Sequence, residues 1–256
     1  MELHFTDTGG AGVPLVIVHG LLGSADNWRS HAKAWASHYR VIALDLRNHG
    51  RSPHASGMTY ADMAQDVVSV LDRCNVDKAY LLGHSMGGKV VISLARLMPE
   101  RVAALIVADI APVAYDHHHD AVFAALRRVE SGEPTDRRQA DALLAEHIDE
   151  KPTRMFLATN LVRDDEGVLR VRVGLDAIEQ GYADIMQLPA GDGSVDLPTL
   201  VLRGDRSDYV NDERLEAVKR VLPRTELVTL SAGHWLHTEQ AEDFQQAVNV
   251  FLSRLA

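Results

Sequence analysis

Positions 81–88 read Leu81-Leu82-Gly83-His84-Ser85-Met86-Gly87-Gly88, an apolar run that passes abruptly into small residues. The pattern Gly-x-Ser-x-Gly within it is typical of a nucleophile elbow, a tight turn between a strand and a helix that lifts a serine hydroxyl above a sheet. In this interpretation Ser85 is a strained nucleophile, and Gly83 and Gly87 are small because strand and helix nearly touch there. The same five-residue pattern occurs by chance in ordinary turns, so the surrounding sequence decides.

The flanking residues supply the strand and the helix that an elbow needs. Residues Ala79 to Leu82 form a short apolar run, as expected for a strand buried on both faces. After the elbow, apolar residues recur at helical spacing until Pro99 stops the pattern, and they are Val90, Val91, Leu94, Ala95 and Met98. The sequence therefore predicts a strand, a turn and a helix in this order.

Composition limits the class of protein. A chain of 256 residues with 46% apolar content is long enough for one large α/β domain with an insertion. Its net charge of -10, from 36 acidic and 26 basic residues, repels phosphate and anionic lipid headgroups, so neither nucleic acid nor a membrane surface is an expected partner. We expect a monomer or a homodimer that acts on a small molecule.

Cysteine usage and the N-terminal residues bear on localisation. The lone Cys74 cannot form an internal disulfide, and its place in an apolar helical repeat predicts that it faces the core rather than acting as a reactive thiol. The N-terminus lacks the basic-then-apolar layout of a signal peptide, and no apolar run is long enough to cross a membrane. These features predict a cytoplasmic protein.

Further apolar runs predict more strands on both sides of the elbow. They are Leu15–Val18, Val41–Leu44, Ala104–Ala108, Thr199–Leu202 and Glu226–Leu230. Amphipathic helical patterns accompany them, and a terminal one includes Phe244, Val248 and Phe251. The alternation predicts an α/β fold with a mostly parallel central sheet flanked by helices.

The strand pattern disappears between Pro112 and about Ala190. Charged amphipathic helices replace it, with a turn predicted at Asp164–Gly167. We therefore expect a core domain of residues 1–111 and 191–256, and a mainly helical cap of residues 112–190 inserted after the strand that ends at Asp109. Such a cap would shape a substrate pocket.

Two other strand ends offer partners for Ser85. The strand Leu15–Val18 runs into His19-Gly20-Leu21-Leu22, and a backbone N–H of Leu21, or of its neighbour Leu22, would join that of Met86 in an oxyanion hole. The final strand runs into Gly233-His234. Because His234 follows Ser85 in the order nucleophile, acid, histidine, it is the predicted general base.

Two aspartates compete for the role of the triad acid. Asp109 ends an unbroken apolar strand 24 positions after Ser85, where a buried carboxylate is costly unless it is used or paired. Asp208 lies four residues after Gly204, one position later than the usual Gly-x-x-Asp placement, which Ser207 occupies. We favour Asp109 and keep Asp208 as the alternative.

Several motifs resemble those of known enzymes. The chain resembles the α/β-hydrolase superfamily through His19-Gly20, the elbow and Gly233-His234. The runs Asp45-Leu46-Arg47-Asn48-His49-Gly50, Met63-Ala64-Gln65-Asp66, Gly83 to Lys89 and Asp109-Ile110-Ala111-Pro112-Val113 are similar to those of YbfF-type bacterial esterases. This resemblance implies a serine carboxylesterase with a small helical cap, active on short to medium acyl esters and on acyl-CoA thioesters as a further class. It also places the triad acid at Asp109.

Other polar clusters are interpreted as structural. The loop from Asp45 to Ser52 is rich in short polar side chains that satisfy local backbone groups. The consecutive His117, His118 and His119 cannot all point at one ion and lack the i, i+4 spacing of a helical metal site, so we expect a solvated cap entrance. No metal and no cofactor is predicted.

Four alternatives to an esterase share some of these features. A cofactor-free haloperoxidase or a carbon–carbon bond hydrolase uses the same triad on the same fold, which fold alone cannot separate. A non-catalytic binding protein would have no reason to keep serine, histidine, acid and glycine hinges together. A haloalkane dehalogenase is disfavoured because it needs a carboxylate nucleophile at the position of Ser85.

Overall fold

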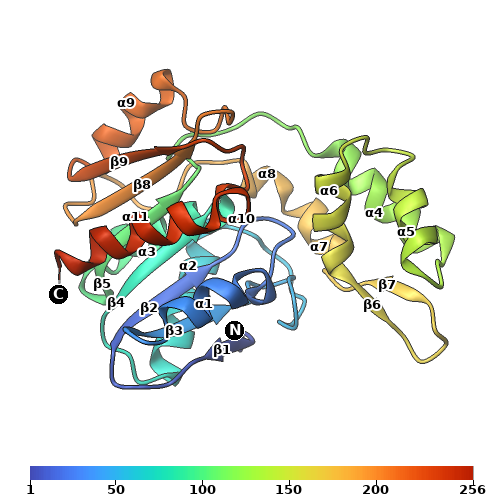
Figure 1. Cartoon of the computed structure of the whole chain (residues 1–256), viewed down its shortest axis with the longest axis horizontal. Coiled ribbons are helices and arrows are strands. Elements are labelled where there is room, and N and C mark those ends of the chain that lie inside the picture. Colours follow the sequence, from blue (N-terminus) through green and yellow to red (C-terminus); the bar gives the residue numbers. More distant parts are fainter. Residues whose placement is uncertain (256) are drawn as a thin grey trace.

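A seven-stranded sheet runs through the computed structural model, which describes residues 1–255 (Figure 1). Its spatial order is β1-β3-β2-β4-β5-β8-β9, and every neighbouring pair is parallel except β1 and β3. The strands are β1 (Phe5–Asp7), β2 (Val13–Val18), β3 (Tyr39–Leu44), β4 (Ala79–His84), β5 (Val102–Ala108), β8 (Thr199–Gly204) and β9 (Thr225–Leu230). The predicted α/β fold with a mostly parallel sheet is confirmed, and the elbow strand β4 lies at its centre.

Helices cover both faces of this sheet. On one face lie α1 (Arg29–Trp35) and α11 (Ala241–Ser253), and on the other lie α2 (Tyr60–Arg73), α3 (Met86–Leu97) and α9 (Asp212–Val221) (Figure 1). Strand β2 shows how the sheet serves two cores, because Leu15 and Ile17 pack toward the first face whereas Val16 and Val18 pack toward the second. Burial on both faces explains why the strands are nearly continuous apolar runs.

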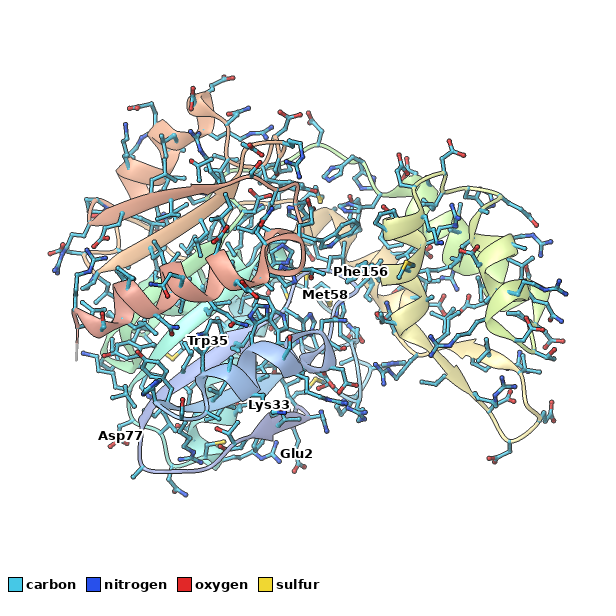
Figure 2. All side chains as sticks on the ribbon, viewed as in Figure 1. Glu2, Lys33, Trp35, Met58, Asp77 and Phe156 are labelled. Atoms are coloured by element: carbon cyan, nitrogen blue, oxygen red, sulfur yellow. The ribbon has the colours of Figure 1, made fainter. Side chains whose placement is uncertain are left out.

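Residues 112–190 lie between β5 and β8 in the chain and beside the sheet in space (Figure 1). The elements are α4 (Asp120–Gly132), α5 (Arg137–Leu144), α6 (Lys151–Leu157), β6 (Leu161–Arg163), β7 (Leu169–Val171), α7 (Leu175–Gln180) and α8 (Tyr182–Ile185). The turn expected at Asp164–Gly167 joins β6 to β7 in an antiparallel hairpin, with Gly167 at φ +85°. Phe156 of α6 points back toward the core, where its ring lies 5.3 Å from that of Trp235 (Figure 2).

Some elements escaped the sequence analysis. Strand β1 is three residues long and largely exposed, so it carries no apolar run. It pairs with β3 through the backbone ladder and through an ion pair between Asp7 and Arg40. Helix α1 is seven residues long, too short for a clear periodic pattern. Both lie away from the elbow.

Two smaller predictions concern residues that pack around the sheet. Cys74 is buried and free in the core, as predicted, and burial raises the pKa of its thiol. The carboxylate of Asp45 accepts hydrogen bonds from the backbone N–H groups of Ala25, at 2.7 Å, and Arg51, at 2.8 Å. This bonding supports the structural interpretation of the loop from Asp45 to Ser52.

In residues 1–255, no helix is both long and apolar enough to span a bilayer.

Candidate active site

The turn between β4 and α3 has the strained geometry of a nucleophile elbow. Ser85 has φ 53° and ψ -122°, a backbone conformation that costs an ordinary residue free energy. A Cβ on Gly83 would clash with the carbonyl oxygen of Gly87, and a Cβ on Gly87 would clash with that of Val18. The two glycines therefore allow strand, helix and neighbouring strand to approach closely enough to form the turn.

Three side chains from distant parts of the chain meet at this turn. The Nε2 atom of His234 lies 3.1 Å from Ser85 Oγ, and its Nδ1 atom lies 2.7 Å from Asp109 Oδ2. Asp109 is fully buried, whereas the His234 side chain keeps 24% of its surface exposed. The residues follow β4, β5 and β9, so the parallel sheet brings them to one edge. The arrangement has the geometry of a serine nucleophile, a base and an orienting acid.

The structure separates the two candidate acids. Asp109 has φ 52°, and its carboxylate also accepts hydrogen bonds from the Gly204 N–H, at 3.1 Å, and from the Ser207 hydroxyl. Asp208 is exposed, and its side chain makes no hydrogen bond or ion pair within residues 1–255. The sequence did not identify Ser207 as a residue of the site. Its place at the usual position of the triad acid could have indicated that its side chain lies near His234.

Two backbone N–H groups of residues that line the Ser85 pocket are free to donate a hydrogen bond. Those of Leu21 and Met86 have no hydrogen-bond partner in residues 1–255, and both residues line the pocket around Ser85. Leu22 instead has φ 60°, and its side chain packs into the core. Leu21 lines the pocket and Leu22 does not, so the N–H of Leu21 stays the preferred prediction for the partner of Met86, with that of Leu22 as the alternative.

A residue from the 112–190 segment holds the loop that carries Leu21. The buried Asn160 donates a hydrogen bond from Nδ2 to the carbonyl of Leu22 at 2.8 Å, across 138 residues of sequence. The carbonyl of Asn160 in turn accepts a hydrogen bond from the N–H of Arg172. Nothing in the local sequence pattern indicated this contact.

Aromatic rings enclose the imidazole of His234. Tyr209 stacks on one side at 4.1 Å between ring centroids, and His84 packs at 4.8 Å. His84 also bonds through Nε2 to the His234 carbonyl at 2.8 Å and packs against His237, which stacks on Trp28. Rings packed on both sides restrict rotation of the imidazole that joins Ser85 to Asp109.

The buried histidines are expected to destabilise the fold in acid. Burial, with the neighbouring His234, lowers the pKa of His84 to about 3, and burial lowers that of His49 to about 3. A histidine in the unfolded chain has a pKa of about 6.5. Below that value the unfolded state binds more protons than the folded state, so stability falls as the pH falls toward 3.

These two histidines together should lower the free energy of unfolding by about 3 kcal/mol between pH 6.5 and 5. Urea unfolding followed by circular dichroism at several pH values measures this loss. The exposed His38 serves as a control, because His38→Asn should keep the wild-type pH dependence. Equal stability at pH 5 and pH 6.5 would contradict the prediction.

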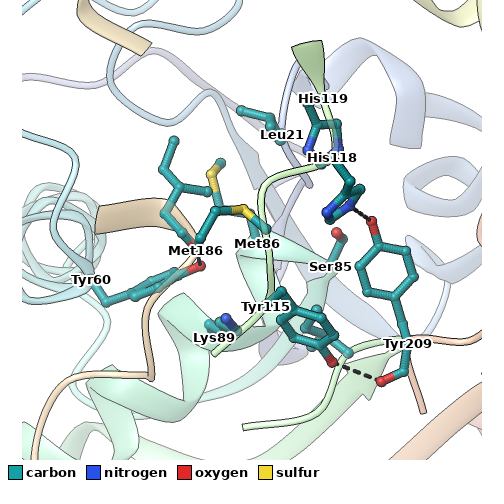
Figure 3. A pocket seen from close by; sticks show the side chains of 12 residues that line it. Leu21, Tyr60, Ser85, Met86, Lys89, Tyr115, His118, His119, Met186 and Tyr209 are labelled. Atoms are coloured by element: carbon teal, nitrogen blue, oxygen red, sulfur yellow. Dashed lines mark hydrogen bonds between the residues drawn. The ribbon is translucent and has the colours of Figure 1, made fainter. Parts of the chain in front are cut away.

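A pocket opens beside Ser85 between the core and the 112–190 segment (Figure 3). Its lining comprises Leu21, Tyr60, Ser85, Met86, Lys89, Ile110, Tyr115, His118, His119, Ile185, Met186 and Tyr209. The cavity measures about 30 Å³ and is open to solvent.

The three consecutive histidines face different surroundings. His118 bonds through Nε2 to the Tyr209 hydroxyl at 2.6 Å (Figure 3). His119 bonds through Nδ1 to the Tyr182 hydroxyl. His117 is exposed and lies outside the pocket lining. In the part of the chain that the structure describes, no three histidine, cysteine or acidic side chains are placed to hold a metal ion. The expectation of a solvated entrance needs correction for His119, which is half-buried and lines the pocket.

Comparisons with known proteins agree with this geometry. The alpha/beta hydrolase fold family model matches residues 13–241. Esterase YbfF from Escherichia coli is 37% identical over 94% of this chain and 93% of its own length, and the sn-1-specific diacylglycerol lipase ABHD11 from Mus musculus is 38% identical over 93% and 80%. These matches confirm the resemblance that the sequence motifs indicated.

A solved structure agrees over nearly the whole chain. An esterase from a marine microorganism shares 40% sequence identity and superposes with a TM-score of 0.94, covering 98% of this chain and 99% of its own. The agreement includes the sheet, the covering helices and the 112–190 segment, because so little of either chain is left out. The chain therefore belongs to the alpha/beta hydrolase fold family, and within it to the YbfF-type esterases.

Proposed function

We propose that this hydrolase cleaves carboxylic esters through an acyl-enzyme on Ser85. The observation that carries the proposal is the hydrogen-bonded line from Ser85 through His234 to the buried Asp109, at the edge of a pocket. The relatives described as esterases and as diacylglycerol lipases support ester hydrolysis as the reaction class. The hydrogen-bonded side chains of Ser85, His234 and Asp109 are sufficient by themselves to form a nucleophile.

The geometry supports a two-stage reaction. His234 takes the proton of the Ser85 hydroxyl while Oγ attacks the ester carbonyl, and the N–H groups of Leu21 and Met86 stabilise the resulting oxyanion. His234 then gives the proton to the leaving alkoxide, which departs as the alcohol. A water molecule, deprotonated by the same imidazole, hydrolyses the acyl-enzyme and restores Ser85. Asp109 holds His234 in the tautomer that presents Nε2 to the serine.

The proposed roles of the two chain regions follow from the pocket. Residues 1–111 and 191–256 would form the catalytic core, and residues 112–190 the cap. His118, His119, Ile185 and Met186 all contribute to the pocket from that segment. The small cavity supports short acyl groups as preferred substrates, with longer ones and acyl-CoA thioesters requiring more displacement of the cap side chains.

Substrate preference is tested with p-nitrophenyl esters of rising acyl length and with the corresponding acyl-CoA thioesters. We expect kcat/KM to be highest for short to medium acyl esters and to fall for long chains, because the 112–190 segment limits the space. Activity should also rise as the pH increases from acid, because His234 must be neutral to accept a proton. A purified protein without activity on any of these substrates would contradict the proposed function.

Asn160 should act on the reaction through the oxyanion loop. In Asn160→Asp a carboxylate oxygen replaces the donor that bonds to the Leu22 carbonyl, so the loop loses its hydrogen bond. We expect kcat to fall by about tenfold with little change in KM, since the full loss of one oxyanion donor costs about 10²–10³. Steady-state kinetics on a p-nitrophenyl ester measures kcat and KM separately.

A matched control is His54→Ala. His54 Nε2 bonds to the Arg172 carbonyl at 3.1 Å, so it also links the core to the 112–190 segment, but it does not contact the oxyanion loop. This variant should keep the wild-type kcat. A loss of kcat in His54→Ala equal to that in Asn160→Asp would show that the segment's attachment matters and not the loop.

A further inference from the structure

A buried lysine lies in the wall of the pocket that holds Ser85. Lys89 follows Ser85 by about one turn of α3, and only 1% of its surface is exposed. Its Nζ atom donates a hydrogen bond to the carbonyl of Gln187 at 2.6 Å. Two rings flank the ammonium, that of Tyr115 at 4.7 Å and that of Tyr60 at 5.5 Å from Nζ to the ring centroid (Figure 3).

This ammonium lacks a counter-charge. It has three N–H donors, and within residues 1–255 a single carbonyl accepts from them. No carboxylate oxygen of that part of the chain lies within 4.0 Å of Lys89 Nζ. Burial of an unpaired cation is unfavourable, and here it lowers the lysine pKa to about 7. The aromatic faces of Tyr60 and Tyr115 attract the cation but do not neutralise it.

We propose that Lys89 binds a carboxylate group of the substrate, so that the preferred esters are monoesters of dicarboxylic acids. The proposal rests on the proposed esterase function and names its substrate class. A carboxylate in the pocket would supply the missing counter-charge. It would also accept hydrogen bonds from the N–H groups of the ammonium that have no partner. Charge-assisted hydrogen bonds of this kind are strong where water is excluded.

The overall charge of the protein makes this local cation informative. With a net charge of -10, the surface as a whole repels an anionic substrate, so a favourable position must come from the pocket itself. A lysine with a purely structural role, joining α3 to Gln187, would need only one N–H donor. It would not need to line the pocket. Lys89 lines the same pocket as the nucleophile. The lysine thus offers a second point of attachment beside the reacting carbonyl.

The test compares an anionic ester with a neutral ester of similar length. We would measure kcat/KM for monomethyl glutarate and for methyl hexanoate, and repeat the pair with monoesters of shorter and longer diacids. In the wild type the anionic ester should be preferred at the best spacing. In Lys89→Met, which keeps the unbranched side chain up to the position of Cε but lacks the charged amine, the ratio of the two values should fall about 10- to 100-fold.

Arg214→Met provides a control with the same loss of charge. The Arg214 guanidinium lies 4.7 Å from the Tyr115 ring but does not line the pocket. This variant should keep the wild-type preference for the anionic ester. An unchanged ratio in Lys89→Met, or an equal fall in Arg214→Met, would overturn the proposal. Acetyl esters of hydroxy acids, with the carboxylate on the alcohol side, show which side of the ester Lys89 contacts.

A binding measurement separates this proposal from the proposed function. In folded Ser85→Ala, calorimetry should show monomethyl glutarate binding at least tenfold more tightly than methyl hexanoate, whether or not Lys89→Met folds. Equal affinity for the two would overturn the role of Lys89 even if the wild type hydrolyses esters. Tighter binding of the anionic ester, combined with a wild type that hydrolyses no ester, would support Lys89 and reject the esterase.

Discussion

Ser85→Ala is expected to lower kcat by about 10⁶, a factor based on the loss of the nucleophile in a serine protease. The variant removes the hydroxyl that lies 3.1 Å from His234 Nε2 and leaves no other nucleophile on the elbow. Without it no acyl-enzyme forms, and the remaining rate comes from substrate binding and the oxyanion donors. Steady-state hydrolysis of a p-nitrophenyl ester measures the effect.

The same substitution should leave the fold intact. The hydroxyl of Ser85 faces the pocket, and alanine is small enough for the turn, although it keeps the unfavourable φ of 53°. Circular dichroism and the urea midpoint check this point. Ser69→Ala, at a half-buried serine of α2 outside the pocket lining, should keep wild-type activity. A folded Ser85→Ala variant that retains most of the activity would contradict the proposed mechanism.

Covalent labelling identifies the nucleophile independently of kinetics. A fluorophosphonate should modify Ser85 at one equivalent per chain, because His234 increases the nucleophilicity of its oxygen. Peptide mass spectrometry locates the label. Stoichiometric labelling of another serine would move the proposed site.

Asp109→Asn is expected to lower kcat by on the order of 10⁴, again by comparison with the serine proteases. The carboxylate accepts the Nδ1–H of His234 at 2.7 Å, so the amide would favour the wrong tautomer and remove the charge that stabilises the protonated ring. The N–H of Gly204 bonds to Oδ1, so the amide oxygen can keep this bond and hold the side chain in place. The amide NH2 would then lie at the position of Oδ2, where the Ser207 hydroxyl can accept from it instead of donating. The loss should therefore appear in kcat rather than in stability.

Asp208→Asn is the matched control for the acid. Asp208 is one residue beyond Ser207, is exposed, and does not contact His234. The kcat of the Asp208→Asn variant should stay within a few-fold of the wild-type value. If Asp208→Asn loses about 10⁴ in kcat while folded Asp109→Asn stays active, the acid must be reassigned to Asp208.

Local patterns in the sequence determined the strands, the elbow and the order of the site residues along the chain. Apolar runs such as Leu15–Val18 and Leu105–Val107 are readable because a strand buried on both faces must be apolar at every position. The glycines at 83 and 87 are readable for a similar reason, since the turn excludes a side chain at both. Because Ser85 and His234 each come just after a predicted strand, the sequence indicated that both lie at one edge of a parallel sheet.

The tertiary structure alone decided which polar groups outside the predicted triad meet. The Ser207 hydroxyl reaches Asp109 across 98 residues, and the Asn160 amide reaches Leu22 across 138, contacts that leave no periodic trace in sequence. Lys89 illustrates the same limit, because a lysine on α3 is ordinarily expected at the surface. Only the packing of Tyr60 and Tyr115 around it creates a buried ammonium. Periodicity records which face of an element is apolar, whereas contacts between polar side chains depend on how whole elements pack, and no single segment encodes that packing.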